Sequence, residues 1–395
     1  MNFHKYVTET YGRSYLSIGM DTQQVLESED GRKWMASGDT RQFLKQLSKI
    51  AHENRHAVEK DSEAACANCD LIIAHPLHLY YGCYLSEKHN IPIIIANPFP
   101  IAPATRAFPH FLTGTRILPF GFLNKATYRL AARMYEKGLR KDMDDWRGGL
   151  GLAPSRGDLF SKVEHQNIPI MQAFSRELVS PPEDWGDRVV ITGQWKIPKR
   201  YVPEQEKQPL STQLVEWLDD GSPPIYFGFG SLPVLEPQKM LDMVVDITRI
   251  LNARAIIASG WSELDSGRGR LPDTVKMVKS VNHELLFPRC CTIIHHGGAG
   301  TTHTAIESGV PAIICSTYAD QPFWGERITA LGIGRHIPFP KLTQKKLLQG
   351  IRELQSPEVL ARASNVARRM KAENGLETAL KFLDDQIPTA PVYQN

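Results

Sequence analysis

Features that assign a chain to a specialised class of protein are scarce in this sequence. It has only six cysteines in 395 residues, and Cys290 and Cys291 are adjacent, which is a poor geometry for bridging each other. No Asn-x-Ser/Thr sequon occurs, and no charged and apolar leader opens the chain. These absences argue against a secreted, disulfide-linked protein, and we expect a reducing, cytoplasmic location.

Long apolar runs and an excess of one charge are also lacking. Apolar runs such as residues 91–96 are far shorter than the ~18 residues that a membrane span needs. With 46 Lys and Arg against 43 Asp and Glu, the net charge of +3 gives no basic field suited to nucleic acid. A small, fairly neutral partner is therefore favoured, and peripheral contact with a membrane surface is left open.

The sequence does contain alternating strand and helix patterns, which indicate an α/β protein. Its length and 42% hydrophobic content suit two or three domains. In the first half, strands at 71–74 and 91–96 flank a helix at 79–88, which makes a βαβ unit. Residues 123–146 read as one long amphipathic helix. The pair Cys66 and Cys69 has the spacing of redox or zinc-binding cysteines, but a helix end packed under the strand at 71–74 is the favoured interpretation.

The second half repeats the rhythm after a polar, proline-containing linker. We expect a first domain at 1–195, a linker at 196–209 and a second domain at 210–395, whose last helix is a candidate to cross back to the first domain. The expected elements are strands at 224–229, 253–258, 292–294 and 311–315, and helices at 236–251, from 301, after 321 and within 343–383. The first domain differs because no strand and turn open it, so we expect it to lack its first strand, turn and helix.

The densest local signal is Ile293-Ile-His-His-Gly-Gly-Ala-Gly-Thr-Thr302, an apolar strand that runs into a glycine-rich turn and then a helix. Glycines allow close backbone approach, and a helix N-terminus attracts negative charge, so this pattern predicts a phosphate site. No Gly-x-x-x-x-Gly-Lys-Ser/Thr occurs, which excludes P-loop hydrolysis. A dinucleotide-binding oxidoreductase is disfavoured because His303 stands where the third Rossmann glycine is needed.

Polar residues near this turn suggest what else binds there. Adjacent His295 and His296 point apart and have no companion ligands at metal spacing, so we expect no metal. Asp320 and Gln321 follow the strand at 311–315, at the same sheet edge as the glycine turn. A carboxylate and an amide at this edge suit the binding of sugar hydroxyls. The alternative is that Asp320 and Gln321 have only structural roles, in a helix cap and a turn.

These residues resemble glycosyltransferase family 1 enzymes of the GT-B fold, and within them the sterol 3-beta-glucosyltransferase-like branch. The likeness lies in His295–Thr302, in Gly309-Val-Pro311 and in Asp320-Gln-Pro-Phe-Trp-Gly325, and extends to residues 227–231 and 282–288. The resemblance implies two Rossmann-like parallel-sheet domains that face a cleft. It also implies an inverting transferase that moves a hexose, glucose in the first instance, from a UDP-sugar to a hydroxyl of a lipophilic acceptor, without cofactor or metal.

The same resemblance implies roles for individual residues. Asn282 departs from the family, which has proline at that position, and this puts the exact base-binding backbone in doubt. The implied diphosphate, base and sugar contacts are His296, Gly298, Ala299, Gly300, Thr301, Ser231, Ser280, Val281, Asp320 and Gln321.

The acceptor side is less complete. The family's catalytic base lies after a first strand that has no counterpart here. Among the residues present, His75 is the candidate base; the alternative is that it is a loop histidine with no catalytic role. A donor-binding remnant without that base is therefore the alternative function. Candidate acceptor contacts are His78, Phe99, Phe108 and Phe111. Two alternatives are open for the aromatic residues: they pack on their own domain as a loop, or residues 106–122 dock on a membrane surface.

Overall fold

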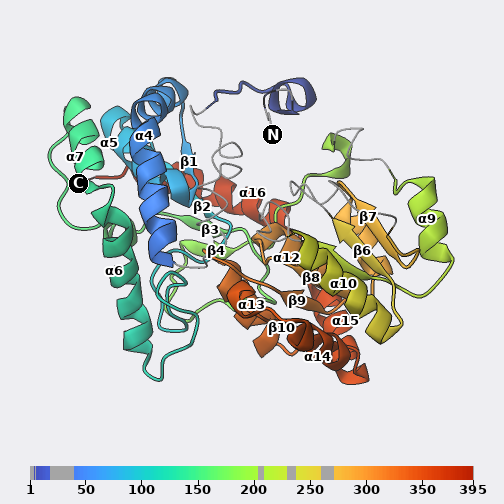
Figure 1. Cartoon of the computed structure of the whole chain (residues 1–395). Coiled ribbons are helices and arrows are strands. Elements are labelled where there is room, and N and C mark those ends of the chain that lie inside the picture. Colours follow the sequence, from blue (N-terminus) through green and yellow to red (C-terminus); the bar gives the residue numbers. More distant parts are fainter. Residues whose placement is uncertain are drawn as a thin grey trace. The chain divides into compact units, whose positions relative to one another are not determined.

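The computed structural model describes residues 4, 6–17, 40–202, 209–228, 237–258 and 271–394. They divide into two compact units, each built on one parallel sheet (Figure 1). Unit 1 comprises the described parts of residues 1–22, 41–201 and 373–395, and unit 2 comprises those of 23–40 and 202–372. The chain therefore passes from unit 1 to unit 2 beside Tyr201, inside the polar linker, and returns to unit 1 at Glu373.

Unit 1 has a four-stranded sheet in the order β1-β2-β3-β4, with all pairings parallel. Isoleucines at 93, 94 and 95 are at most 1% exposed, because helices cover both faces of a parallel sheet. The strands are β1 (Ile72–Ala74), β2 (Ile93–Asn97), β3 (Ile170–Gln172) and β4 (Val189–Ile191). The helices are α4 (Thr40–Cys66), α5 (Leu79–His89), α6 (Gly121–Lys137), α7 (Arg140–Gly149), α8 (Leu159–His165) and α16 (Gly375–Gln386), with shorter turns at η1 (Tyr6–Thr10), η2 (Pro76–His78), η3 (Lys199–Tyr201) and η6 (Ile387–Thr389).

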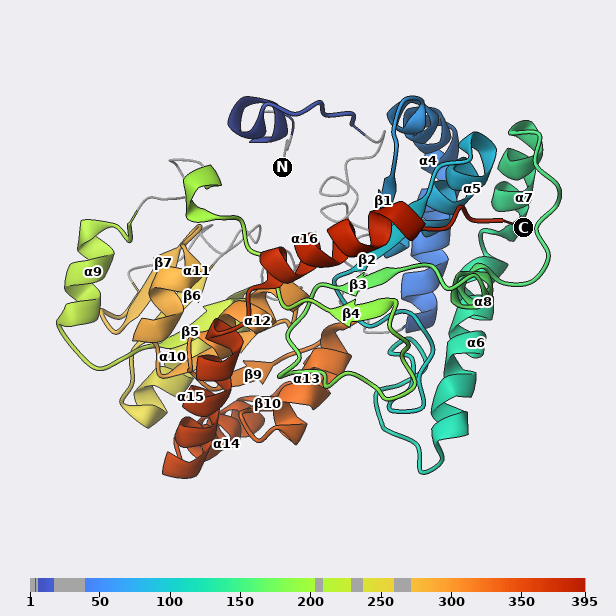
Figure 2. The ribbon, with the colours of Figure 1, turned by 180° about the vertical axis from the view of Figure 1, so that it is seen from behind.

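The C-terminal segment belongs to the core of unit 1. Figure 2 shows α16 lying across the strands of this sheet, where Ala379 and Phe382 pack on Ile94 and Met171. Beyond α16 the chain is held by backbone contacts, since the Ile93 amide donates to the Pro391 carbonyl at 3.2 Å. Residues 375–394 thus contribute directly to the packing of the first sheet.

The prediction of one helix at 123–146 is wrong, because the chain forms α6 and α7 with a break at Gly138 and Leu139. α4 approaches this point closely, and the Ser48 hydroxyl donates to the Gly138 carbonyl at 2.8 Å. A Cβ on Gly138 would lie 2.3 Å from the same hydroxyl oxygen. The contact diverts the Gly138 carbonyl from a helical hydrogen bond, which ends α6.

Unit 2 has six parallel strands in the order β10-β9-β8-β5-β6-β7. Counted along the chain, this is the 3-2-1-4-5-6 order of a doubly wound dinucleotide-binding sheet. The strands are β5 (Ile225–Gly228), β6 (Ala255–Ala258), β7 (Val275–Val278), β8 (Thr292–His295), β9 (Ala312–Ile314) and β10 (Gly334–His336). The helices are α9 (Thr212–Asp219), α10 (Pro237–Leu251), α11 (His283–Leu286), α12 (Ala299–Glu307), α13 (Gln321–Ala330), α14 (Gln344–Leu354) and α15 (Pro357–Lys371), with η4 (Phe287–Arg289) and η5 (Phe339–Lys341).

The cysteines and the helices agree with the expectations from composition. All six cysteines are free thiols, and Cys66 ends α4 just before β1, which confirms the structural interpretation of the Cys66 and Cys69 pair. Within the described ranges, none of the helices combines the length and the apolar character that a membrane crossing requires.

Candidate functional site

The sheet of unit 2 reverses its strand order between β5 and β8. In doubly wound sheets, ligands bind outside the carboxyl ends of the strands at such a point. Gly228, the last residue of β5, pairs with His295, the last residue of β8. The glycine-rich turn predicted from the sequence therefore starts at the position where ligands bind in such sheets.

The two histidines of the turn are buried and neutral. The Nδ1 of His295 accepts a hydrogen bond from the Gly297 amide at 3.1 Å, and complete burial lowers the pKa of this ring well below 6.5. In the neutral ring Nε2 then carries the proton, and it has no partner among the described residues. Burial also lowers the pKa of His296 to about 4, opposed by a hydrogen bond with the Gly228 backbone. The turn thus offers uncharged imidazole groups rather than cations.

Two glycines of the turn have very different surroundings. Gly297 has φ +97°, and a Cβ there would lie 2.5 Å from Cγ2 of Ile314 and 3.3 Å from Cβ of Gln321. This close approach brings the turn against the start of α13. A Cβ on Gly300 would meet nothing within 4 Å. Glycine at 300 is therefore not required by the protein's own packing, and leaves room for a ligand.

The N-terminus of α12 offers unpaired backbone donors. Gly298 is the N-cap and supplies no side-chain cap, and the first amide bonded within the helix is that of Thr302, which donates to the Gly298 carbonyl at 2.9 Å. The amides of Ala299, Gly300 and Thr301 form no hydrogen bond with the rest of the described chain. By contrast, serine or threonine side chains cap α9, α14 and α15. Free amides at the positive end of a helix dipole are the groups to which anions bind in proteins.

Gln321 and Asp320 lie beside that site with defined orientations. The Oε1 of Gln321 accepts from the Thr317 amide at 2.8 Å and from the Thr317 hydroxyl at 2.9 Å, which leaves its Nε2 as a free donor. The Oδ2 of Asp320 accepts from Nε1 of Trp324 at 2.6 Å, and burial raises the pKa of this carboxyl to about 6. Asp320 occupies the N-cap position of α13 but makes no cap hydrogen bond. The capping alternative is therefore wrong for its side chain.

A partly buried hydrogen-bond chain behind these residues was not predicted from the sequence. The Ser316 hydroxyl lies 2.7 Å from Nε2 of His336, and Nδ1 of the same ring lies 2.9 Å from Oε1 of Glu326. A Cβ on Gly325 would lie 2.5 Å from Cδ2 of His336, so α13 packs directly on this ring. The chain links β9, β10 and α13, and so fixes the elements that carry Asp320 and Gln321.

The structure says less about the other residues predicted to contact the donor, namely Ser231, Ser280 and Val281. Ser231 lies outside the described residues. Ser280 is exposed and Val281 is half-buried, directly after β7, which is three strands from β8 in the sheet. Asn282 accepts a hydrogen bond from the Glu284 amide at 3.0 Å and so caps α11. This gives the residue that departs from the family a local structural role.

In unit 1, aromatic rings connect three of the predicted acceptor-side residues. The His75 ring lies 6.3 Å from Phe99, and Phe99 lies 5.5 Å from Phe111, each edge to face. His78 lies one turn further on, against Tyr81 at 5.8 Å. Phe108 is separate: it is buried against Trp185 within the core of unit 1. For Phe108, packing on its own unit is the interpretation that the contacts favour.

The sheet order and the uncapped, glycine-rich helix start give unit 2 the architecture of a doubly wound α/β unit. A family model described as "Erythromycin biosynthesis protein CIII-like, C-terminal domain" matches residues 240–378. A sterol 3-beta-glucosyltransferase of Arabidopsis thaliana is 36% identical over 326 residues, 81% of this chain and 49% of the relative. An uncharacterised protein of Mycobacterium bovis is 33% identical over 313 residues, 78% of this chain and 70% of the relative.

Solved structures share the fold at lower identity. The glycotransferase of kitacinnamycin superposes with a TM-score of 0.65 at 18% identity, covering 87% of this chain and 83% of that one. The glycosyltransferase VinC in complex with DTDP gives a TM-score of 0.56 at 19% identity, covering 93% and 83%. The chain has the GT-B fold of these glycosyltransferases, and the matched part of its sequence is similar to sterol 3-beta-glucosyltransferases. It spans about half the length of the two Arabidopsis relatives that it matches, 49% and 53%.

Proposed function

We propose that the protein is an inverting glycosyltransferase that moves glucose from UDP-glucose to a hydroxyl of a lipophilic acceptor such as a sterol, with no resident metal or cofactor. The observation that carries the proposal is the set of three unpaired amides at the N-terminus of α12, at the switch point of the sheet. A relative named as a sterol 3-beta-glucosyltransferase supports the choice of sugar and acceptor.

Departure of the diphosphate is the step that this site can assist. As the bond to the sugar breaks, negative charge grows on the leaving oxygens, and donors that are already in place stabilise it without reorganising. A single charge at a helix terminus gains only about 0.3–2 kcal/mol, so the amides, the helix dipole and His296 must act together. The Nε2 of Gln321 donates to a hexose hydroxyl, and the Asp320 carboxylate accepts from one.

The acceptor hydroxyl must lose its proton, and His75 is our candidate base. Its Nδ1 accepts from the Leu77 amide at 3.3 Å, so the neutral ring carries its proton on Nε2. Burial and the neighbouring His78 lower the pKa of His75, which keeps the ring neutral at pH 7. To act as a base through Nε2, His75 must give up the Leu77 hydrogen bond and move its proton to Nδ1.

Calorimetry with UDP tests the donor half of the proposal. We expect wild-type protein to bind UDP, and both His296→Ala and Gly300→Ala to weaken binding about tenfold or more, because one removes the ring that supports the turn and the other fills the space of the ligand. Gly148→Ala is the matched control: Gly148 is also helical, and a Cβ there would meet nothing within 4 Å. If folded wild-type protein does not bind UDP, the proposal is wrong.

Turnover tests the transferase half. UDP-glucose is offered with a panel of sterols and phenols, and the glycosylated product is measured by mass spectrometry. Product formation that falls in the His296→Ala variant supports the proposal. UDP binding with no turnover of any acceptor would leave the donor site in place and favour the donor-binding remnant instead.

A further inference from the structure

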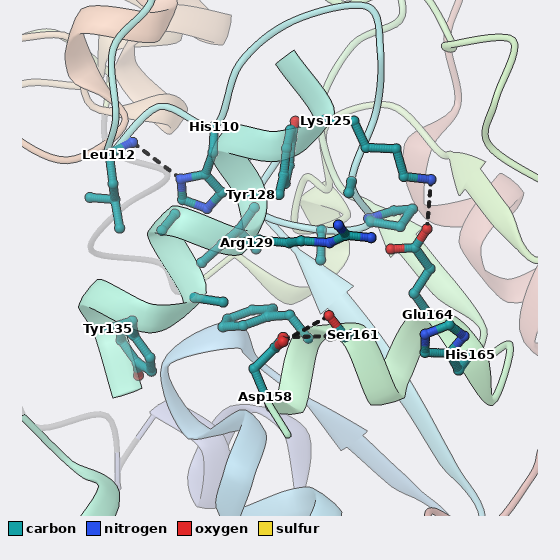
Figure 3. A pocket seen from close by; sticks show the side chains of 17 residues that line it. His110, Leu112, Lys125, Tyr128, Arg129, Tyr135, Asp158, Ser161, Glu164 and His165 are labelled. Atoms are coloured by element: carbon teal, nitrogen blue, oxygen red, sulfur yellow. Dashed lines mark hydrogen bonds and ion pairs between the residues drawn. The ribbon is translucent and has the colours of Figure 1, made fainter. Parts of the chain in front are cut away.

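Unit 1 contains a cavity of about 170 Å³ between α6, α8 and the loop at residues 101–104 (Figure 3). Neither the residues proposed to bind the donor nor those predicted to contact the acceptor line it. Its walls are largely apolar, with Ala131 and Ala132 at 2% and 3% exposure and Ile101 at 7%. These residues come from one unit, so the cavity is complete within unit 1.

The volume sets the size of the occupant. A dry apolar cavity of roughly 150 Å³ holds a benzene molecule, whereas drug-sized ligands occupy pockets of about 300 Å³ or more. The cavity of about 170 Å³ therefore fits one aromatic ring with a small substituent and cannot enclose a fused multi-ring body. Tyr128 lines the same space at 7% exposure, and its hydroxyl has no hydrogen-bond partner in the described part of the chain.

Of the charged side chains that line the cavity, Arg129 is the cation without an ion-pair partner among the described residues. Lys125 and Glu164 pair with each other at 3.0 Å. Asp158 caps α8, where both the amide and the hydroxyl of Ser161 donate to it at 2.8 Å. Arg129 has no ion-pair partner among the described residues, and in Figure 3 its side chain extends from α6 toward the side where Lys125 and Glu164 lie.

The surroundings of Arg129 favour an anion. Between Glu87 and Glu136 the sequence has no aspartate or glutamate, although it includes Arg106, Arg116, Lys125, Arg129 and Arg133. His110, on the wall of the cavity, is neutral, since burial lowers its pKa to about 3. Two carboxylates line the cavity: Glu164 is paired with Lys125, and Asp158 accepts hydrogen bonds from Ser161, so neither takes up Arg129.

We propose that this cavity binds a single-ring aromatic carboxylate, with its ring between α6 and α8 and its carboxylate on the guanidinium of Arg129. The charged hydrogen bond fixes the orientation of the ligand, and burial of the ring supplies the apolar contact. The proposal does not depend on the transferase activity, because it concerns residues outside the donor site and a ligand that is neither nucleotide nor sterol.

Benzoate and benzyl alcohol, which differ in charge but share the ring, are the probes. Their binding to the full chain is measured by calorimetry and by saturation-transfer NMR. We expect benzoate to bind about tenfold more tightly than benzyl alcohol, and Arg129→Gln to remove that difference. The control is Arg133→Gln, one turn further along α6 and outside the cavity lining, which we expect to change benzoate affinity less than about twofold.

A second pair of variants tests the place of the ring. Ala132→Leu fills the cavity and should abolish binding of both probes, whereas Ala126→Leu puts the same side chain at an exposed position of α6 and should leave binding unchanged. Circular dichroism and thermal unfolding establish that each variant is folded. The proposal is overturned if neither probe binds folded wild-type protein, if both bind equally, or if the Arg133→Gln variant loses benzoate as the Arg129→Gln variant does.

Discussion

The carboxyl edges of the two sheets leave opposite kinds of polar group without a partner. In unit 1 the side-chain amides of Asn97 and Gln172, at the ends of β2 and β3, donate to the Ala102 carbonyl at 3.0 and 2.6 Å. Their oxygens are buried and without a hydrogen-bond partner in the described chain. In unit 2 the groups left over are mainly donors, namely three amides of α12 and the Nε2 atoms of Gln321 and His295; Nδ1 of His296 is the exception.

This difference shows that two parallel sheets of similar architecture present different polar chemistry at their carboxyl edges. Leftover donors attract the oxygens of a diphosphate, whereas leftover carbonyl oxygens repel an anion and accept from a hydroxyl. The strand arrangement alone does not determine whether an edge attracts an anion or a hydroxyl. We infer that the polarity of the unpaired groups determines it, and the variants below change or probe that polarity.

The largest effect is expected from Gly297→Ala. A side chain here must adopt φ near +97° and displace Ile314, whose Cγ2 would lie 2.5 Å from the new Cβ. Strain and overpacking together should lower the free energy of unfolding by about 2–4 kcal/mol and abolish UDP binding, because the amides of α12 lose their alignment. Chemical denaturation and calorimetry measure the two effects. Gly300→Ala is the comparison, and should retain full stability; a stable Gly297→Ala variant that binds UDP would contradict the role of the turn.

Gln321→Glu turns the free donor of unit 2 into an acceptor. A glutamate can still accept from the Thr317 amide and hydroxyl, so we expect stability within about 1 kcal/mol of wild type. Affinity for the sugar portion of the donor should fall about ten- to hundredfold, seen as weaker binding of UDP-glucose with unchanged binding of UDP. Equal losses for both ligands would indicate that Gln321 acts through the fold instead.

Asp320 should make stability and donor binding depend on pH in opposite ways. Its pKa of about 6 lies above the ordinary 3.8, so the folded state holds this proton more tightly than the unfolded state. The free energy of unfolding is therefore greater below pH 4 and decreases by about 1–2 kcal/mol as pH rises to 6. UDP-glucose binding should strengthen over the same interval, because the ionised carboxylate is the better acceptor for a hydroxyl.

Asp320→Asn isolates this contribution. Its unfolding curve, measured from pH 4 to pH 7.5, should lack the step that wild-type protein shows. An unchanged pH dependence in the variant would assign the step to another group.

The smallest effect is expected from Asn97→Ala in unit 1. The variant loses one donor to the Ala102 carbonyl, but Gln172 still donates to it at 2.6 Å, so the free energy of unfolding should fall by only about 1 kcal/mol. UDP affinity should not change, since Asn97 lies in the other unit. A loss of UDP binding as large as that of Gly297→Ala would break the comparison between the two edges.

The sequence predicts the donor site better than the acceptor side, for a physical reason. The glycine turn, its helix and Asp320 with Gln321 are short contiguous segments that follow apolar strands, and parallel strand ends meet at one edge. We did not predict β3, β4, β7 and β10, which have three or four residues each, too few for periodicity to mark them; β1 and β9 are as short but were predicted from their apolar runs.

Contacts between distant segments are the other part that the sequence does not reveal. The break at Gly138 depends on Ser48, and the chain of Ser316, His336 and Glu326 joins three separate elements. The cavity at Arg129 likewise arises where α6, α8 and a loop meet. Such features depend on packing, and no local pattern marks them.

The return of the chain to unit 1 at Glu373 also orders events during synthesis. All of residues 202–372 leave the ribosome before α16, whose Ala379 and Phe382 complete the packing on Ile94 and Met171. Tyr393, fully buried, and the Pro391 contact with Ile93 come later still. The part of unit 2 at residues 202–372 can therefore fold on the nascent chain before α16 is made, while the first sheet keeps one face uncovered until α16 has been added.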